Sequence, residues 1–341
     1  MDFDPGAAAQ PGSGIFGLPH APDEAQVHVL GVPFEATTSY RAGTANGPEA
    51  VLAASRQIDL FDLRFGRPYE AGIWMVPSDG EIRHWSDEAR ALARPLIERG
   101  GSGPGDLEQA QRVDAYSVRV NERVQAFTAR TLDREKLPVL VGGDHSTPFG
   151  QITQCAKRYP GLGLVQFDAH ADLRSAFEGF RWSHASIMHN VLETCAGVAQ
   201  LLQIGVRDLS EQEHEVIRGD SRVRALFDTD IDAARCENRL RAQARAALAT
   251  LPNEIYVSFD IDALEPALCP NTGTPVPGGL TWPETMVWLE ELAACGKRIV
   301  GLDLNEVSPG AAWEPEADDE WDAVVGARLL YRLIGAALGQ R

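Results

Sequence analysis

Short apolar runs alternate with longer amphipathic segments along most of the chain. The runs are rich in Val, Ile, Leu and Phe throughout their length, which is typical of strands buried on both faces of a sheet. We expect strands at residues 27–32, 137–143, 162–168, 200–206, 223–228, 254–260 and 298–307. Apolar residues at helical spacing predict helices between the strands, including 108–131, 185–195, 233–251, 281–295 and 321–338.

This alternation predicts an α/β fold in which a mostly parallel central sheet is covered by helices on both faces. Residues 26–341 show neither an internal repeat nor a long polar linker, so we expect a single domain there. Residues 1–25 begin with a segment rich in Ala, Pro and Gly that has little to bury. We expect them to form a flexible leader.

The net charge of the chain limits the classes of molecule that it is expected to bind. The 31 Lys and Arg residues are outnumbered by 49 Asp and Glu, which gives a formal net charge of −18. Such an acidic chain repels phosphate backbones and anionic lipids, so we expect no nucleic-acid or membrane partner. The five cysteines are scattered and form no CxxC pair, which argues against a disulfide framework. The beginning of the chain lacks the pattern of a signal peptide, and a cytoplasmic location is expected.

Three of the expected strands end in acidic and imidazole residues. The carboxyl ends of these strands overlap the segments GGDHS at 142–146, DAHAD at 168–172 and SFDID at 258–262. In parallel sheets, ligands bind beyond the carboxyl ends of the strands. Any one of these segments alone would as readily be a helix cap or a tight turn. Three of them at three strand ends favour a common site.

The spacing of these residues predicts a metal site. Residues two apart on a strand-to-loop segment point to the same side, so four carboxylates and two imidazoles can converge: His145, Asp168, His170, Asp172, Asp260 and Asp262. Without cations the four carboxylates would repel one another. The set suits two divalent cations, and its oxygen-rich composition favours Mn²⁺ over Zn²⁺, with Ni²⁺, Co²⁺ and Fe²⁺ as alternatives.

The three motifs resemble GGDHS, DAHxD and SxDxDxxDP of the arginase and agmatinase family, the ureohydrolases. Here they stand at 142–146, 168–172 and 258–266, and the similarity extends from Ser39 to Asp322. The resemblance implies a three-layer α/β/α fold, a dinuclear Mn²⁺ site and a homo-oligomer, either a trimer or a hexamer. It also implies a small guanidino compound as substrate, from which urea is released.

Carried over residue by residue, the resemblance assigns the ligands. One ion would be bound by His145, Asp168, Asp172 and Asp260. The other would be bound by His170, Asp168, Asp260 and Asp262, so that Asp168 and Asp260 bridge the ions. A hydroxide shared between the two ions would be the nucleophile that attacks the guanidinium carbon.

The resemblance also implies two catalytic side chains beyond the ligand Asp172. Glu306 matches the glutamate that holds the guanidinium, and His184 matches the histidine that shuttles a proton to the leaving amine. Without the family pattern, His184 would be interpreted as a surface histidine at a helix start. The other five histidines are expected to be structural or solvated: His20, His28, His84, His189 and His214.

Two positions depart from the family pattern. Glu265 replaces the usual Asp before Pro266, and loop 173–183 lacks the Asn and Ser set with which arginases hold the amino-acid end of arginine. In that loop Glu178 could pair with a distal ammonium, whereas Arg174 or Arg181 would pair with a distal carboxylate. We therefore expect agmatine or a related guanidine as substrate.

Several alternatives remain at this point. Arginase, guanidinobutyrase and guanidinase activities use the same chemistry on other guanidines. A formimidoylglutamase would use the same machinery and release formamide. A regulatory member of the fold without catalysis would be expected to have lost ligands, yet all six are present.

Overall fold

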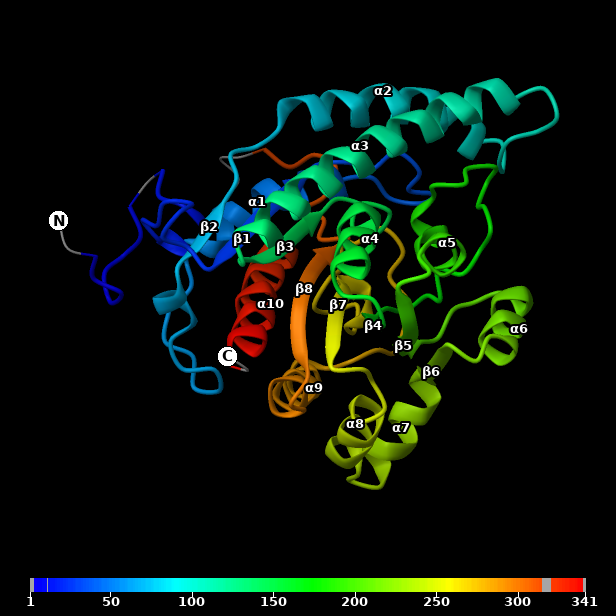
Figure 1. The fold of residues 1–341 in the computed structure, drawn as a ribbon. Coiled ribbons are helices and arrows are strands. Elements are labelled where there is room, and N and C mark those ends of the chain that lie inside the picture. The colour runs from blue at the N-terminus through cyan, green and yellow to red at the C-terminus, as the bar shows by residue number, and fades with distance from the viewer. Residues whose placement is uncertain (1–2, 11, 315–319, 340–341) are drawn as a thin grey trace.

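The computed structural model describes residues 3–10, 12–314 and 320–339 (Figure 1). Within this part of the chain, one fully parallel sheet has the strand order β2-β1-β3-β8-β7-β4-β5-β6. The strands are β1 (Val27–Val32), β2 (Ile73–Met75), β3 (Leu137–Gly142), β4 (Leu162–Phe167), β5 (Val198–Val206), β6 (Val223–Phe227), β7 (Glu254–Asp260) and β8 (Arg298–Asn305).

Helices cover both faces of this sheet and give the three-layer α/β/α architecture that the family resemblance implied (Figure 1). One face carries α1 (Gly47–Ser55), α7 (Asp228–Cys236), α8 (Leu240–Leu248), α9 (Trp282–Ala294) and α10 (Trp321–Leu338). The other carries α2 (Gly80–Ile97), α3 (Leu107–Asp133), α4 (Phe149–Arg158), α5 (Ile187–Thr194) and α6 (Glu211–Gly219).

The strands are apolar throughout because both of their faces are buried. In β4, Leu162 and Leu164 pack with α4 and α5, whereas Val165 and Phe167 pack in the opposite layer. There the ring of Phe167 lies edge-on to that of Trp288 from α9, with 5.9 Å between ring centroids. Alternate side chains of one strand thus supply both cores, as strand geometry requires.

All seven predicted strands are present, with ends that differ by at most two residues from the expected ones. Strand β2 was not predicted because its three residues are too short for a periodic signal. The expected helix 233–251 is in fact two helices, α7 and α8. Between them Asn238 adopts φ 53°, a left-handed conformation that ends a helix.

The segment expected to be a leader includes core residues. Ile15, Phe16 and Leu18 are buried, and the Phe16 N–H donates a 2.8 Å hydrogen bond to Ser55 Oγ of α1. The division of the chain into a leader and a domain stays a prediction. None of the helices in the described residues is long and apolar enough to cross a membrane.

Candidate metal centre

The site lies at the carboxyl edge of the four central strands, which are adjacent in the order β3-β8-β7-β4. The turn after β3 passes close to other backbone, since a Cβ on Gly143 would lie 2.0 Å from the Phe34 carbonyl oxygen. Asp144 then holds the turn by accepting hydrogen bonds from the Ser146 N–H and Oγ–H, at 3.0 and 2.5 Å. This local structure directs His145 toward the ends of the neighbouring strands.

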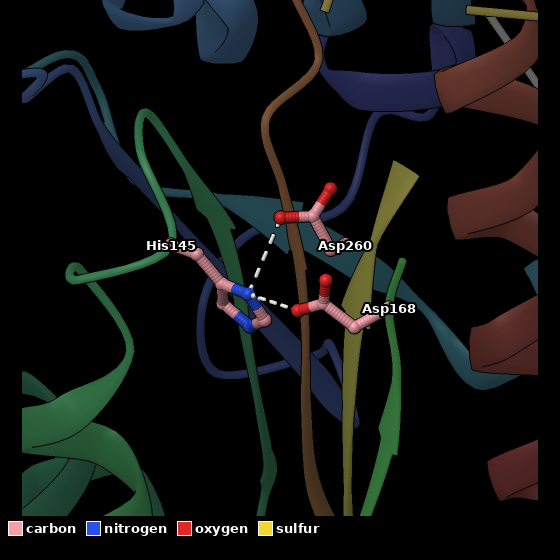
Figure 2. Close-up of side chains that lie close together, drawn as sticks. All are labelled: His145, Asp168 and Asp260. Atoms are coloured by element: carbon pink, nitrogen blue, oxygen red, sulfur yellow. Dashed lines mark ion pairs between the residues drawn. The ribbon is translucent and has the colours of Figure 1, made fainter. Parts of the chain in front are cut away.

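Three carboxylates converge on one nitrogen of His145. Its Nδ1 lies 2.9 Å from Asp168 Oδ2, 3.1 Å from Asp172 Oδ2 and 3.2 Å from Asp260 Oδ2. Figure 2 shows the imidazole pointing between Asp168 and Asp260, which extend from the ends of β4 and β7. Asp172 comes into reach because its backbone turns sharply, with φ 54°.

A second cluster shares Asp168 with the first. His170 Nδ1 lies 3.5 Å from Asp168 Oδ1 and 3.0 Å from Asp262 Oδ2. The sets His145, Asp168, Asp260 and Asp168, His170, Asp262 each bring their ligand atoms within 4.8 Å of one another. The two oxygens of Asp168 therefore face different imidazoles, as a bridging carboxylate would.

Divalent cations would satisfy these imidazole and carboxylate groups better than hydrogen bonds among the groups themselves do. A ring nitrogen carries at most one proton, yet three buried carboxylates surround Nδ1 of His145, and none makes a hydrogen bond of good geometry with it. Oxygen ligands with two imidazoles and no thiolate are a donor set for Mn²⁺ and its neighbours in the first transition row. Two such sets with one common carboxylate could hold two ions.

Hydrogen bonds from a second layer of residues fix the orientation of the ligands. His145 Nε2 lies 2.9 Å from Ser258 Oγ, whose hydroxyl donates to Asp303 Oδ1 at 2.9 Å. This assigns the Nε2–H to Ser258 and leaves the Nδ1 lone pair free for a metal. Gln166 Nε2 donates to Asp168 Oδ2 at 2.7 Å. Asp303 was not among the expected site residues, because the sequence of its strand gives no sign that its side chain would contact the residues that orient a metal ligand.

The electrostatics of the metal-free site are unfavourable. Burial raises the pKa of Asp172 to about 7, and repulsion by Asp168 adds to this. Burial, with repulsion from Asp262 and Asp168, raises the pKa of Asp260 well above its usual value. For Asp168 burial also acts upward, but the two adjacent imidazoles outweigh it and lower its pKa. Bound cations would relieve this crowding.

Glu306 follows β8 and lies beside the first cluster. Its Oε1 accepts a 2.9 Å hydrogen bond from the His145 backbone N–H, while Oε2 is buried and has no hydrogen-bond partner. A Cβ on Gly273 would lie 3.3 Å from Oε2, so the missing side chain leaves space at this oxygen. Burial, with repulsion from Asp260 and Asp144, raises the pKa of Glu306 well above its usual value. A cationic group is the natural partner for such a carboxylate.

His184 begins a short 3-10 turn (His184–Ser186) ahead of α5. Its Nδ1 lies 3.4 Å from both Thr37 Oγ1 and Ser183 Oγ, and its backbone N–H donates to Thr37 Oγ1 at 3.3 Å. Burial lowers the pKa of His184 to about 3. Thr37 was not among the expected site residues, because it is 147 residues away in sequence.

The charged side chains of the rim loop, defined as residues 173–183, differ in whether they have partners. The Arg174 guanidinium lies 3.5 Å from Glu213 and 4.8 Å from the Phe177 ring centroid, and Arg181 pairs with Glu193 at 2.9 Å. Glu178 differs from both, because its Oε2 is buried and has no hydrogen-bond partner. The Phe177 ring lies edge-on to His184 with 6.1 Å between centroids, which places the rim loop beside the site.

Two of the histidines expected to be structural have partners outside the two metal clusters, and so does Cys269. His28 Nε2 lies 2.8 Å from the Pro22 carbonyl oxygen, and His189 is 3.9 Å from Glu193. Cys269 is buried next to the segment that carries Asp260 and Asp262, and its Sγ lies 3.3 Å from the Ile261 carbonyl oxygen. Neither candidate metal cluster includes Glu265 or Cys269.

The chain is similar to known proteins along most of its length. The sequence profile of the Arginase family matches residues 25–335. N(1)-aminopropylagmatine ureohydrolase of Thermus thermophilus is 30% identical over 323 residues, 94% of each chain, and agmatinase of Proteus mirabilis is 32% identical over 82% of this chain and 79% of its own. The structure of proclavaminate amidino hydrolase from Streptomyces clavuligerus superposes with a TM-score of 0.72, covering 98% of this chain and 100% of that one, at 22% identity.

The chain therefore belongs to the arginase family. It is a ureohydrolase of the agmatinase-like type, an enzyme that cleaves a guanidino C–N bond and releases urea.

Proposed function

We propose that this enzyme hydrolyses a guanidine whose far end carries an ammonium group, as in agmatine or an aminoalkyl derivative of agmatine. The observation that carries the proposal is the unequal pairing on the rim loop. Arg174 and Arg181 already have carboxylate partners, whereas Glu178 presents a buried carboxylate oxygen without one. A substrate ammonium would supply the missing partner.

The relatives support this choice. The names of the two relatives above refer to agmatine or an aminopropyl derivative of it. Both compounds are cationic away from the guanidinium, which also suits a chain with a net charge of −18.

The metal ions belong to the same proposal. His145, Asp168, Asp172 and Asp260 would hold one ion, and His170, Asp168, Asp260 and Asp262 the other. We propose Mn²⁺ at both positions, with Ni²⁺ as the alternative. When bound, two such cations lower the pKa of water far enough to supply a nucleophile at neutral pH.

The remaining steps fall to side chains of this chain. Glu306 Oε2 would pair with the guanidinium and hold its carbon in place. Because the Thr37 hydroxyl accepts the His184 backbone N–H, its own proton is free to point at Nδ1. The neutral imidazole then carries its proton on Nε2. To pass that proton to the departing amine, His184 would take up a second proton at Nδ1 from solvent, so that it acts as an imidazolium and returns to the neutral form as the amine leaves.

A panel of substrates tests the proposal. The protein is loaded with Mn²⁺, and separately with Ni²⁺, and incubated with agmatine, N(1)-aminopropylagmatine, arginine, 4-guanidinobutyrate, guanidine and formimidoylglutamate. We expect urea from agmatine or its aminopropyl derivative at a kcat/KM at least tenfold above that for arginine and guanidinobutyrate. A preference for either acidic guanidine, for guanidine itself, or release of formamide from formimidoylglutamate would contradict it. The cytoplasmic location and the trimeric or hexameric assembly stay predictions.

A further inference from the structure

Arg207 follows β5 directly, and its guanidinium donates hydrogen bonds to several backbone carbonyl groups. Its guanidinium donates hydrogen bonds to the carbonyl oxygens of Asp262 at 2.7 Å, Val276 at 3.1 Å, Gly205 at 3.2 Å and Leu264 at 3.3 Å. The shortest of these bonds is to the residue whose carboxylate faces His170. The guanidinium thereby joins three segments: the end of β5, residues 262–264 and the loop at 276.

The backbone of the same residue is tied to a second ligand segment. The N–H groups of Arg207 and Asp208 both donate to the Ala169 carbonyl oxygen, at 2.8 and 3.1 Å. Ala169 lies between Asp168 and His170, and its own N–H donates to Asp262 Oδ1 at 3.0 Å. Arg207 therefore contacts both of the segments that form the cluster of Asp168, His170 and Asp262.

Neighbouring glycines leave the space that this guanidinium occupies. A Cβ on Gly279 would lie 2.8 Å from Arg207 Nη2 and 2.7 Å from the Leu264 carbonyl oxygen. A Cβ on Gly278 would lie 3.3 Å from Arg207 Cδ and 2.6 Å from Asp228 Oδ2. Both glycines have positive φ, near +95°, which a side chain would strain further. The Arg207 side chain is thus closely surrounded, and its planar guanidinium has little room to adopt another orientation.

We propose that Arg207 is a positioning residue for one of the two metal ions, the ion held by His170 and Asp262. It acts through Asp262, by fixing the backbone of that residue against the segment that carries His170. The first cluster depends on it less, because His145 is oriented by Ser258 and Glu306, which Arg207 does not contact. This inference rests on the proposed dinuclear centre.

The test measures the affinity of each ion separately. Metal-free wild-type protein and the variants Arg207→Lys and Arg207→Ala are titrated with Mn²⁺ by calorimetry, and ions per chain are counted after dialysis. His170→Ala identifies which binding step belongs to the second cluster. We expect both Arg207 variants to bind that ion about ten- to a hundredfold more weakly, the usual effect of losing an outer partner of a ligand, while the other ion binds within about threefold of wild type.

Arg235→Lys is the matched control. Arg235 donates to the Gly279 carbonyl oxygen at 3.3 Å, so it supports the same loop, but its other partners are Glu284 and Asp232 rather than residues of the metal segments. This variant should change thermal stability without separating the two affinities. If Arg207→Ala does not fold, Arg207→Lys decides the matter.

The outcomes separate this inference from the function on which it rests. If wild-type protein does not bind two ions, the proposed dinuclear centre fails. If wild type binds two ions and Arg207→Lys binds both equally well, or loses affinity for both to the same extent, Arg207 is a general structural residue and the inference is wrong.

Discussion

Glu306 is bonded directly to the residue that carries the first metal-facing imidazole: its Oε1 accepts the backbone N–H of His145 at 2.9 Å. The bond joins the end of β8 to the turn after β3. Glu306 adopts φ 60°, a conformation that costs about 1–3 kcal/mol for a residue other than glycine. The fold thus holds the carboxylate in one orientation, with Oε2 left free for a substrate.

The first prediction concerns this carboxylate. Glu306→Gln keeps an oxygen for the His145 N–H but removes the charge that would hold a guanidinium. We expect kcat/KM to fall about tenfold to a hundredfold or more, the equivalent of one charged hydrogen bond, with both metal ions retained. Urea production and metal content are measured on the same sample, with Glu265→Gln as control. Loss of an ion in Glu306→Gln would instead make Glu306 part of the metal centre.

The second prediction concerns the bridge. Fully loaded wild-type protein should hold about two divalent ions per chain, since two ligand clusters share Asp168. Asp168→Ala should lose both ions, whereas Asp262→Ala should lose one, because of the two metal-facing imidazoles Asp262 pairs with that of His170 and not with that of His145. Metal analysis after dialysis distinguishes these results. A wild-type content of one ion or fewer, or a single ion lost from Asp168→Ala, would contradict the shared ligand.

A third prediction separates proton transfer from metal binding. His184→Ala should keep both ions and lose about a hundredfold or more in kcat, the usual size of an acid–base contribution. Thr37→Val should have a smaller effect in the same direction, because it removes one hydroxyl from Nδ1 and leaves that of Ser183. His189→Ala, five residues further along the chain, is the control. Turnover close to wild type in His184→Ala would return His184 to a structural role.

The parts of the site that the sequence predicted are those encoded locally. The six expected ligands follow buried strands at short, regular spacings, and any arrangement of parallel strands brings such ends to one edge of the sheet. Thr37 and Arg207 could not be predicted in the same way. Thr37 meets His184 across 147 residues, and Arg207 reaches the carbonyl of Asp262 across 55. Contacts of this kind depend on which loops the fold brings together, and a backbone acceptor leaves no mark on the sequence.

A fourth prediction follows from the pKa shifts of the metal-free protein. Burial raises the pKa of Asp172 to about 7 and the pKa of Asp260 well above its usual value, from about 3.9 for an aspartate in an unfolded chain. A raised pKa stabilises the fold at low pH, and this contribution is lost as the pH rises toward the folded pKa. The imidazoles of His145 and His170, whose pKa values are raised by adjacent carboxylates against the effect of burial, act in the same direction.

We therefore expect the Tm of metal-free protein to fall between pH 5 and pH 8, while that of metal-loaded protein changes less. The gap between them should widen by on the order of 5 °C. Thermal unfolding with saturating metal and with chelator, at constant ionic strength, measures both. A gap that stays constant or narrows as the pH rises would show that these carboxylates are not protonated in the metal-free fold.

The last prediction concerns the distal end of the substrate. Burial raises the pKa of Glu178, and the guanidinium of Arg90 acts against this, so the carboxylate still lacks a partner that would fully favour its charge. The Arg90 guanidinium itself donates a 2.5 Å hydrogen bond to the Thr38 carbonyl oxygen. A substrate ammonium at Glu178 would form a charge-assisted hydrogen bond in a partly shielded position.

Glu178→Gln should therefore raise KM for agmatine about tenfold, with little change in kcat or metal content, because a contact made equally in the ground state and the transition state is lost. Glu135→Gln is the matched control: Glu135 has φ 57° against 52° for Glu178 and precedes β3 at the opposite edge of the sheet. Arg174→Ala and Arg181→Ala should leave KM within about twofold, since their guanidinium groups pair with Glu213 and Glu193. If instead an arginine variant raises KM and Glu178→Gln does not, the substrate ends in a carboxylate. If none of the three changes KM, the pocket takes a guanidine too short to reach the rim loop.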